Sequence, residues 1–254
     1  MNSQLNQARI QLGQLLSLLF WGLLTVSHCF ANEAQFDKAN RLYETGSFKE
    51  ASALYQAATT NGVSANLFFN LGNAHFKANQ LGKAIASYHQ SMRLDPRNPE
   101  TIANLRFARE KVSLQPPPPT LRQRLLRQIS LGEWTALASG TVTLLLLLLA
   151  TRQLKPNAFA GKPAWILLPT VSALVSVILL AMASADHFLD ERGFVIVPMA
   201  VIRNGPLEES PESFKTPDGT ELRVHDRKGE FLEIETGLSQ KGWIHSDSIE
   251  LLVP

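Results

Sequence analysis

The sequence has 254 residues, of which 45% are hydrophobic, and a formal net charge of +2. The charge is unevenly distributed: residues 32–112 contain ten basic and seven acidic side chains, residues 113–163 contain six and one, and residues 186–254 contain seven and fourteen. A basic stretch followed by an acidic C-terminal part is typical of a protein at a bilayer. A nucleic-acid-binding protein needs a basic patch on a folded domain, so we predict no nucleic-acid partner.

Residues 1–31 are predicted to be a secretory signal peptide. Arg9 precedes an apolar segment of about 15 residues, and the small residue Ala31 stands before a polar turn. A lipid anchor on Cys29 and an uncleaved anchor helix remain as alternatives. If cleavage follows Ala31, the mature chain has no cysteine, which excludes disulfides, thiolate metal sites and cysteine nucleophiles.

Residues 32–112 are predicted to be helical and self-similar. The segment 39–58 aligns with the segment 72–91 at a spacing of 33 residues, and Pro96 closes the second unit. Small residues such as Gly72 let paired helices approach closely, while aromatic residues such as Tyr88 fill the gaps between layers. This pattern resembles the tetratricopeptide repeat.

A third copy begins at Pro99 and stops at Val112, before any second helix, which gives about two and a half repeats. A solenoid of this kind usually needs about three repeats, so we expect a partner, the membrane or self-association to complete the fold.

The resemblance implies a groove for a segment of another protein, lined by side chains of the first helix of each repeat. Asn73 is the favoured contact because its side chain can hydrogen-bond a peptide backbone. The phenylalanines among these residues have the alternative interpretation of core residues. The candidate binding residues are Asn40, Tyr43, Phe69, Asn73, Phe76, Lys77 and Phe107.

Residues 113–133 are predicted to be a linker with an amphipathic segment. Four consecutive prolines, 116–119, favour an extended spacer. Leu121, Leu125 and Ile129 recur every four residues among arginines. This pattern indicates either a short helix on the membrane surface or a water-exposed start of the next helix.

Residues 134–151 and 163–185 are predicted to be transmembrane helices, joined by a cytoplasmic loop, 152–162. Runs of about 18 and about 23 residues give ~27 and ~34 Å of helix, close to the ~30 Å of a bilayer core. The basic loop fits the positive-inside rule, whereas the arginines before the first helix oppose it. Trp134 and Trp165 are predicted interfacial anchors. Both flanking domains would then lie on the outer side of a bacterial cytoplasmic membrane.

In residues 186–254 the apolar residues recur at every second position, which indicates β-strands, and turn signals stand at 204–206, 217–219 and 228–229. The order and spacing of these segments are similar to bacterial SH3-like domains, which predicts a small all-β barrel. The resemblance implies binding of protein segments or wall peptides, and the net charge of −7, from seven basic and fourteen acidic residues, favours a basic or neutral partner. Trp243 is either a core residue or a ligand platform.

The sequence contains neither a nucleophile–base motif nor a phosphate-binding glycine loop, and its histidines lack metal-ligand spacing. We therefore predict no enzyme, no cofactor and no metal. The predicted fold class is a multi-domain membrane protein with all-α tetratricopeptide repeats, two transmembrane helices and a small all-β SH3-like barrel.

The whole order of segments resembles the BatE proteins of bacterial aerotolerance operons. The resemblance implies an envelope scaffold that acts with von Willebrand A-domain membrane proteins and a MoxR-type ATPase in tolerance of oxidative stress. The predicted partners are envelope or membrane proteins, and self-association stays open. The alternative function is association with peptidoglycan through the SH3-like domain.

Overall fold

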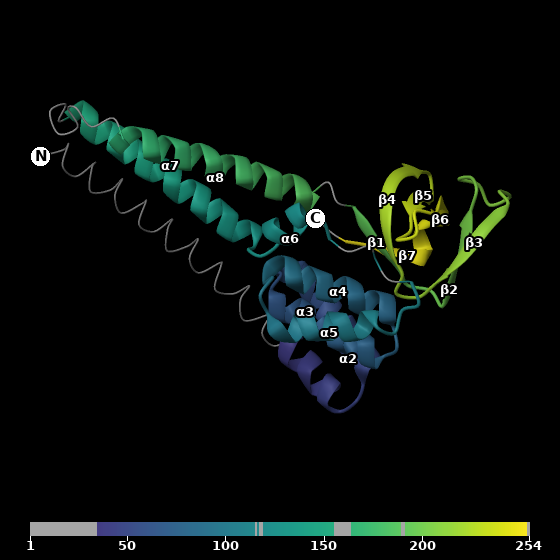
Figure 1. The fold of residues 1–254 in the computed structure, drawn as a ribbon. Helices are drawn as coiled ribbons and strands as arrows, with labels where there is room; N and C mark the ends of the chain where they lie inside the picture. The colour runs from purple at the N-terminus through teal and green to yellow at the C-terminus, as the bar shows by residue number, and fades with distance from the viewer. Residues whose placement is uncertain (1–34, 115, 117–118, 155–163, 189–190, 253–254) are drawn as a thin grey trace, which may run out of the picture.

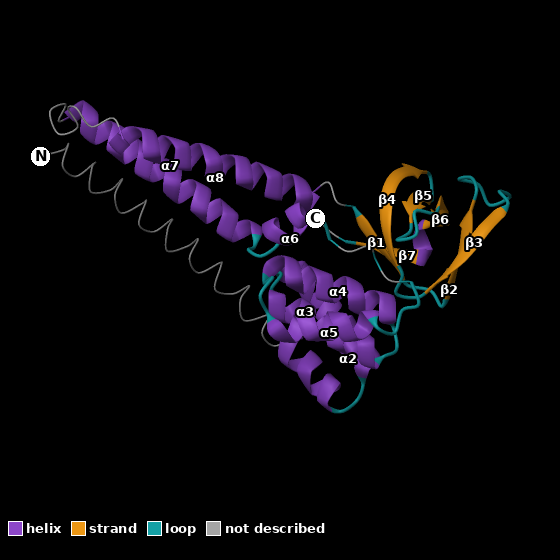
Figure 2. Ribbon diagram, viewed as in Figure 1, coloured by secondary structure: helices purple, strands orange, loops and turns teal. Residues whose placement is uncertain are grey.

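The computed structural model describes residues 35–114, 116, 119–154, 164–188 and 191–252. The predicted signal peptide and most of the predicted loop 152–162 lie outside the described residues. The described chain forms a helical repeat domain, a pair of long helices and a C-terminal sheet domain (Figures 1 and 2). The two long helices extend side by side away from the other two parts (Figure 1).

The repeat domain consists of residues 35–44, which are helical, followed by four helices and a short 3₁₀ turn, η1 (Thr59–Asn61). Side chains cap two of the helices: Ser64 accepts from the backbone N–H of Leu67, and Asn98 accepts from that of Thr101. The helices are α2 (Phe48–Ala58), α3 (Ala65–Lys77), α4 (Leu81–Leu94) and α5 (Pro99–Arg109).

Close contact between α3 and α4 depends on a glycine. A Cβ atom at Gly72 would lie 2.6 Å from the ring of Tyr88, which is itself fully buried. Only a residue without a side chain lets that ring pack directly on the α3 backbone, as expected for a pair of repeat helices.

A short helix, α6 (Leu121–Leu126), leads into the helical pair α7 (Leu131–Leu154) and α8 (Ala164–Phe188). The amphipathic pattern predicted for this region yields only six helical residues, in which Leu126 is buried while Leu121 and Leu125 are exposed. Between α7 and α8, the hydroxyl oxygens of Thr141 and Ser176 lie 2.7 Å apart.

Both long helices are long and apolar enough to cross a membrane, over Leu131–Arg152 and Ala164–Phe188. At about 1.5 Å per residue each measures ~33 to ~38 Å, which exceeds the ~30 Å core of a bilayer. They contact mainly each other and leave large apolar side chains uncovered, including Leu146, Leu167 and Leu168, each at least 60% exposed.

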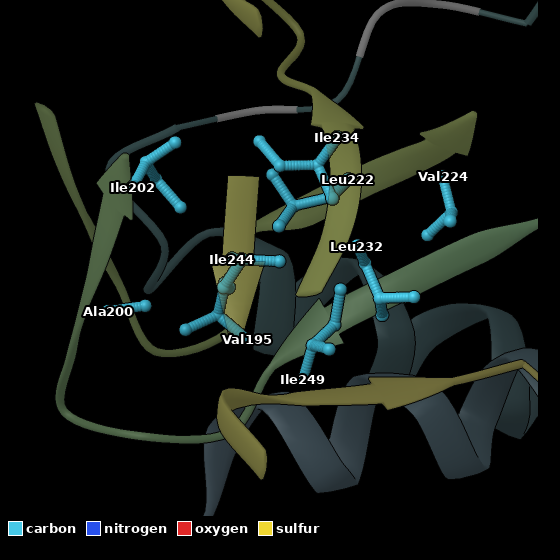
Figure 3. Packing of buried hydrophobic residues seen from close by; sticks show 9 residues of the cluster. All are labelled: Val195, Ala200, Ile202, Leu222, Val224, Leu232, Ile234, Ile244 and Ile249. Carbon is cyan, nitrogen blue, oxygen red and sulfur yellow. The ribbon is translucent and has the colours of Figure 1, made fainter. Parts of the chain in front are cut away.

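The C-terminal domain is one antiparallel sheet of seven strands in the order β3-β2-β6-β5-β4-β1-β7. Its nine-residue hydrophobic core draws side chains from every strand except β3 (Figure 3). The strands are β1 (Arg192–Val195), β2 (Met199–Arg203), β3 (Glu212–Pro217), β4 (Glu221–Lys228), β5 (Phe231–Glu235), β6 (Lys241–His245) and β7 (Ile249–Leu251), with a 3₁₀ turn, η3 (Ser246–Ser248), before the last.

The predicted barrel is not closed. β3 and β7 are the two ends of the sheet, and the strand order of the described residues does not pair them. The physical reason lies in the neighbours of these end strands. β7 is in contact with α4, whereas β3 pairs with β2 and exposes three of its six residues. The prediction of a small all-β domain is confirmed, but the prediction of a closed barrel is wrong.

Candidate functional site

The sheet domain covers the end of the repeat domain. Phe194 of β1 is fully buried and belongs to the same hydrophobic cluster as Ile85, Leu105 and Val112 of the repeat domain. We expected a partner, the membrane or self-association to complete the unfinished third repeat. The structure differs, because a strand of the same chain occupies this position.

An aspartate of the sheet domain caps α4. The carboxylate of Asp218 accepts hydrogen bonds from the backbone N–H groups of Leu81, at 3.0 Å, and Gly82, at 2.9 Å. The residue preceding the helix, Gln80, makes no capping bond with its own side chain. Burial raises the pKa of Asp218, and the two N–H groups act in the opposite direction. An acidic cap at a helix N-terminus is favourable, so Asp218 joins the two domains.

A buried ion pair forms the second polar contact between the domains. The guanidinium of Arg109, on α5, donates two hydrogen bonds to the carboxylate of Glu221, on β4, and one to Nε2 of His89, on α4. Burial alone would raise the pKa of Glu221, but His89 and Arg109 hold that pKa well below its usual range. Burial lowers the pKa of His89. At neutral pH Glu221 is therefore ionised, and its ion pair with Arg109 links the two domains.

A cavity of about 110 Å³ lies between the helix of residues 35–44, α2 and α3. Three of the predicted binding residues, Asn40, Tyr43 and Asn73, line it together. Three further residues complete the lining: Glu44, Tyr55 and Asn70.

Two asparagines of this cavity are held by tyrosines in a repeated arrangement. The hydroxyl of Tyr55 donates to Oδ1 of Asn40 at 2.6 Å, and the hydroxyl of Tyr88 donates to Oδ1 of Asn73 at 2.8 Å. Asn104 also donates to Oδ1 of Asn73 at 2.8 Å. Burial raises the pKa of Tyr55 to about 12 and also raises that of Tyr88, so both remain hydroxyl donors at neutral pH. Asn73, the favoured peptide contact, therefore already has a structural role.

The other four predicted residues do not line this cavity. Phe69 packs against the ring of Tyr88, as the core interpretation predicts. The rings of Phe76 and Phe107 lie 5.6 Å apart, and the ammonium of Lys111 lies 5.0 Å from the ring centre of Phe107. Lys77 is exposed in the last turn of α3. Whether any of these residues contacts a partner stays a prediction.

Sequence reasoning missed Glu44, Tyr55 and Asn70. A signal for two of them was present, because Asn70 lies one helical turn before Asn73 and shares its face. The 15-residue interval from Asn40 to Tyr55 also recurs from Asn73 to Tyr88. The side chains of Glu44 and Asn70 form no hydrogen bond or ion pair with another described residue. A ligand can therefore engage the side chains of Glu44 and Asn70 without breaking a hydrogen bond to another described residue.

Residues 65–98 match the family described as tetratricopeptide repeat. The match covers α3 and α4, which form one repeat beside the cavity. Repeats of this family are typically non-enzymatic modules of protein–protein interaction, which suggests such a role for this domain. No curated protein matches the chain. Among the described residues, no group of three or more His, Cys, Asp or Glu is placed to hold a metal ion.

Proposed function

We propose that this protein is a non-enzymatic, membrane-anchored scaffold whose repeat domain holds a segment of another envelope or membrane protein. The observation that carries this proposal is the cavity of the repeat domain. It combines Glu44 and Asn70, whose side chains form no hydrogen bond or ion pair with another described residue, with Tyr43 and the tyrosine-bound asparagines. Such a lining suits an extended peptide, since amide and carboxylate groups can bond its backbone while aromatic rings contact its side chains.

The anchor in this proposal is the helical pair. We assign the predicted membrane segments, 134–151 and 163–185, to α7 and α8, with both soluble domains on the outer side. Support comes from the exposed leucines of these helices and from the direct contacts Arg109–Glu221 and Asp218–Leu81 between the two domains. Two domains in direct contact have to lie on the same side of a bilayer, which requires an even number of spans between them.

The sheet domain is proposed to act as an SH3-like module that supports the repeat domain. Its acidic character, seven basic and fourteen acidic residues over 186–254, favours a basic or neutral partner segment. The proposal includes von Willebrand A-domain and MoxR-type ATPase partners in oxidative-stress tolerance, and it rests there on the resemblance of the segment order to BatE proteins alone. Sedimentation of the full chain with purified sacculi tests the cell-wall alternative separately.

Chemical crosslinking in native membranes tests the groove. The full chain carries a purification tag, and crosslinked proteins are quantified by mass spectrometry. A double variant Glu44→Gln plus Asn70→Ala removes the polar groups of the cavity. The matched control, Glu50→Gln plus Asn66→Ala, makes the same chemical changes at exposed positions that do not line it.

The proposal predicts that the groove variant yields at least about tenfold less crosslinked partner than the wild type. This is the effect expected when one or two charge-assisted or neutral hydrogen bonds are lost. The control variant should keep the crosslinked partner. Equal recovery by both variants would show that the cavity does not hold the partner.

A further inference from the structure

A second cavity, also of about 110 Å³, lies where the helical pair meets the two soluble domains. Residues of α4, α6, α7, α8 and β1 line it, and these elements lie close together at one end of the pair (Figure 1). The apolar part of the lining includes Met92, Leu126, Trp134 and Ala183. Three arginines, 93, 127 and 192, supply the cationic part, and Asp186 is the acidic residue of the lining.

Internal bonds hold the lining in place. Asp186, in the last turn of α8, accepts from Arg127 at 2.8 Å and from Arg122 at 3.3 Å. Arg93 of α4 donates to the backbone carbonyl of His187. The indole N–H of Trp134, in the first turn of α7, donates to the carbonyl of Leu126 at 3.0 Å. The cavity is thus a built feature that connects the repeat domain to the ends of both long helices.

Charge and position together indicate the ligand. Three guanidinium groups and one carboxylate line the cavity, and the carboxylate of Glu221, 3.9 Å from Arg192, lies outside the lining. The lining therefore carries more positive than negative charge and favours an anion. Guanidinium groups match the oxygens of a phosphate particularly well. The apolar part of the lining continues into the exposed leucine surfaces of α7 and α8, which suit alkyl chains. A group that is anionic at one end and hydrocarbon at the other fits both parts.

We propose that this cavity binds the phosphate headgroup of an anionic phospholipid, with the acyl chains lying along α7 and α8. The inference rests on the proposed membrane anchoring, since the ends of the two helices then lie at the level of the headgroups, where tryptophan and arginine are favoured. Because Arg93 belongs to α4, the bound lipid holds the repeat domain against the membrane surface.

Native mass spectrometry of the full chain in detergent tests the site, with dioleoylphosphatidylglycerol and dioleoylphosphatidylcholine as the added lipids. The double variant Arg93→Gln plus Arg127→Gln removes two positive charges from the cavity. The control, Arg124→Gln plus Arg152→Gln, removes two charges from exposed positions on α6 and at the far end of α7. A second pair leaves the charge unchanged: Ala183→Leu fills the cavity, whereas Ala181→Leu lies on the exposed side of α8.

The wild type is expected to bind the anionic lipid at least about tenfold more tightly than the zwitterionic lipid, because each charged contact contributes about tenfold. The cavity double variant and Ala183→Leu should lose this preference, while both controls keep it. An equal loss in the cavity and control double variants would overturn the site. If excess inorganic phosphate displaces the lipid completely, the ligand of the cavity is free phosphate, and the assignment of a lipid headgroup is overturned.

Flotation with phosphatidylcholine vesicles separates this inference from the proposed function. A chain that does not float with the vesicles contradicts the membrane anchoring itself. A chain that floats but shows no lipid preference contradicts only the headgroup site.

Discussion

The contact between the repeat domain and the sheet domain can be tested at Glu221. Substitution Glu221→Gln keeps the shape of the side chain and removes its charge. It leaves Arg109, whose side chain is 27% exposed, without its ionic partner between the two domains. Breaking a buried ion pair by removing one partner costs about 3–5 kcal/mol, and partial exposure of the arginine lowers this to about 2–3 kcal/mol.

Hydrogen–deuterium exchange of the full chain in detergent measures this cost at the contact itself. A loss of about 2–3 kcal/mol accelerates exchange of amides that open with the contact, at the start of α4 and in β1, by roughly 30- to 150-fold. The control Glu212→Gln removes a surface ion pair with Lys215 and should change exchange very little. Unchanged exchange at α4 and β1 in the Glu221 variant would refute the assignment of this ion pair as a link between the domains.

The same reasoning gives a pH dependence. The pKa of Glu221 is lowered in the folded protein relative to its ordinary value of 4.5. Its contribution to stability is therefore fully present above about pH 4.5 and is lost as the pH falls below that value towards the lowered pKa. Exchange at the contact should accelerate over this range in the wild type and much less in Glu221→Gln.

Three further changes have defined outcomes. In Gly82→Ala the new methyl group would overlap the carbonyl oxygen of Val195, so amide exchange in β1 should accelerate. The control is Gly140→Ala, which should exchange like the wild type because a methyl group at position 140 meets open space. Burial lowers the pKa of His75 to about 4, below its ordinary value of 6.5, so the folded form favours the neutral ring. Stability should then fall by about 2 kcal/mol from pH 7 to pH 5 in urea unfolding of the full chain, and His75→Gln should flatten this decrease. Asn73→Ala should cost about 1–3 kcal/mol in the same assay because it leaves a buried tyrosine hydroxyl without its acceptor.

The helical repeat could be predicted from the sequence because its physics is local. The 33-residue spacing, the glycine opposite Tyr88 and the buried tyrosines all lie within one pair of neighbouring helices. The two long apolar helices could also be predicted, since the length and the composition of a segment are enough to indicate such a helix. The sheet was predicted from its period of two, and its strands pair mostly with near neighbours in sequence.

Contacts between distant segments could not be predicted in this way. Asp218 caps a helix whose first residue lies 137 positions earlier in the chain, and Phe194 takes the place expected for an external partner. Asp218 was visible in the sequence as part of the predicted turn 217–219, but a turn signal does not indicate which helix the aspartate caps. The same limit applies to the predicted groove residues, because repeat alignment does not indicate which asparagines are already hydrogen-bonded to tyrosines. That these residues bind a peptide stays a prediction.

The central claim is a membrane-anchored scaffold with both soluble domains on the outer side, and labelling of single cysteines in intact cells tests it most directly. Cys29, the one cysteine of the sequence, is replaced by serine. Cysteines are then introduced one at a time as Arg41→Cys, Asn157→Cys and Glu209→Cys, and a membrane-impermeant maleimide is added before and after lysis. The account predicts labelling at positions 41 and 209 in intact cells, and at 157 only after lysis. Labelling at position 157 in intact cells would contradict the account, and so would labelling at only one of positions 41 and 209.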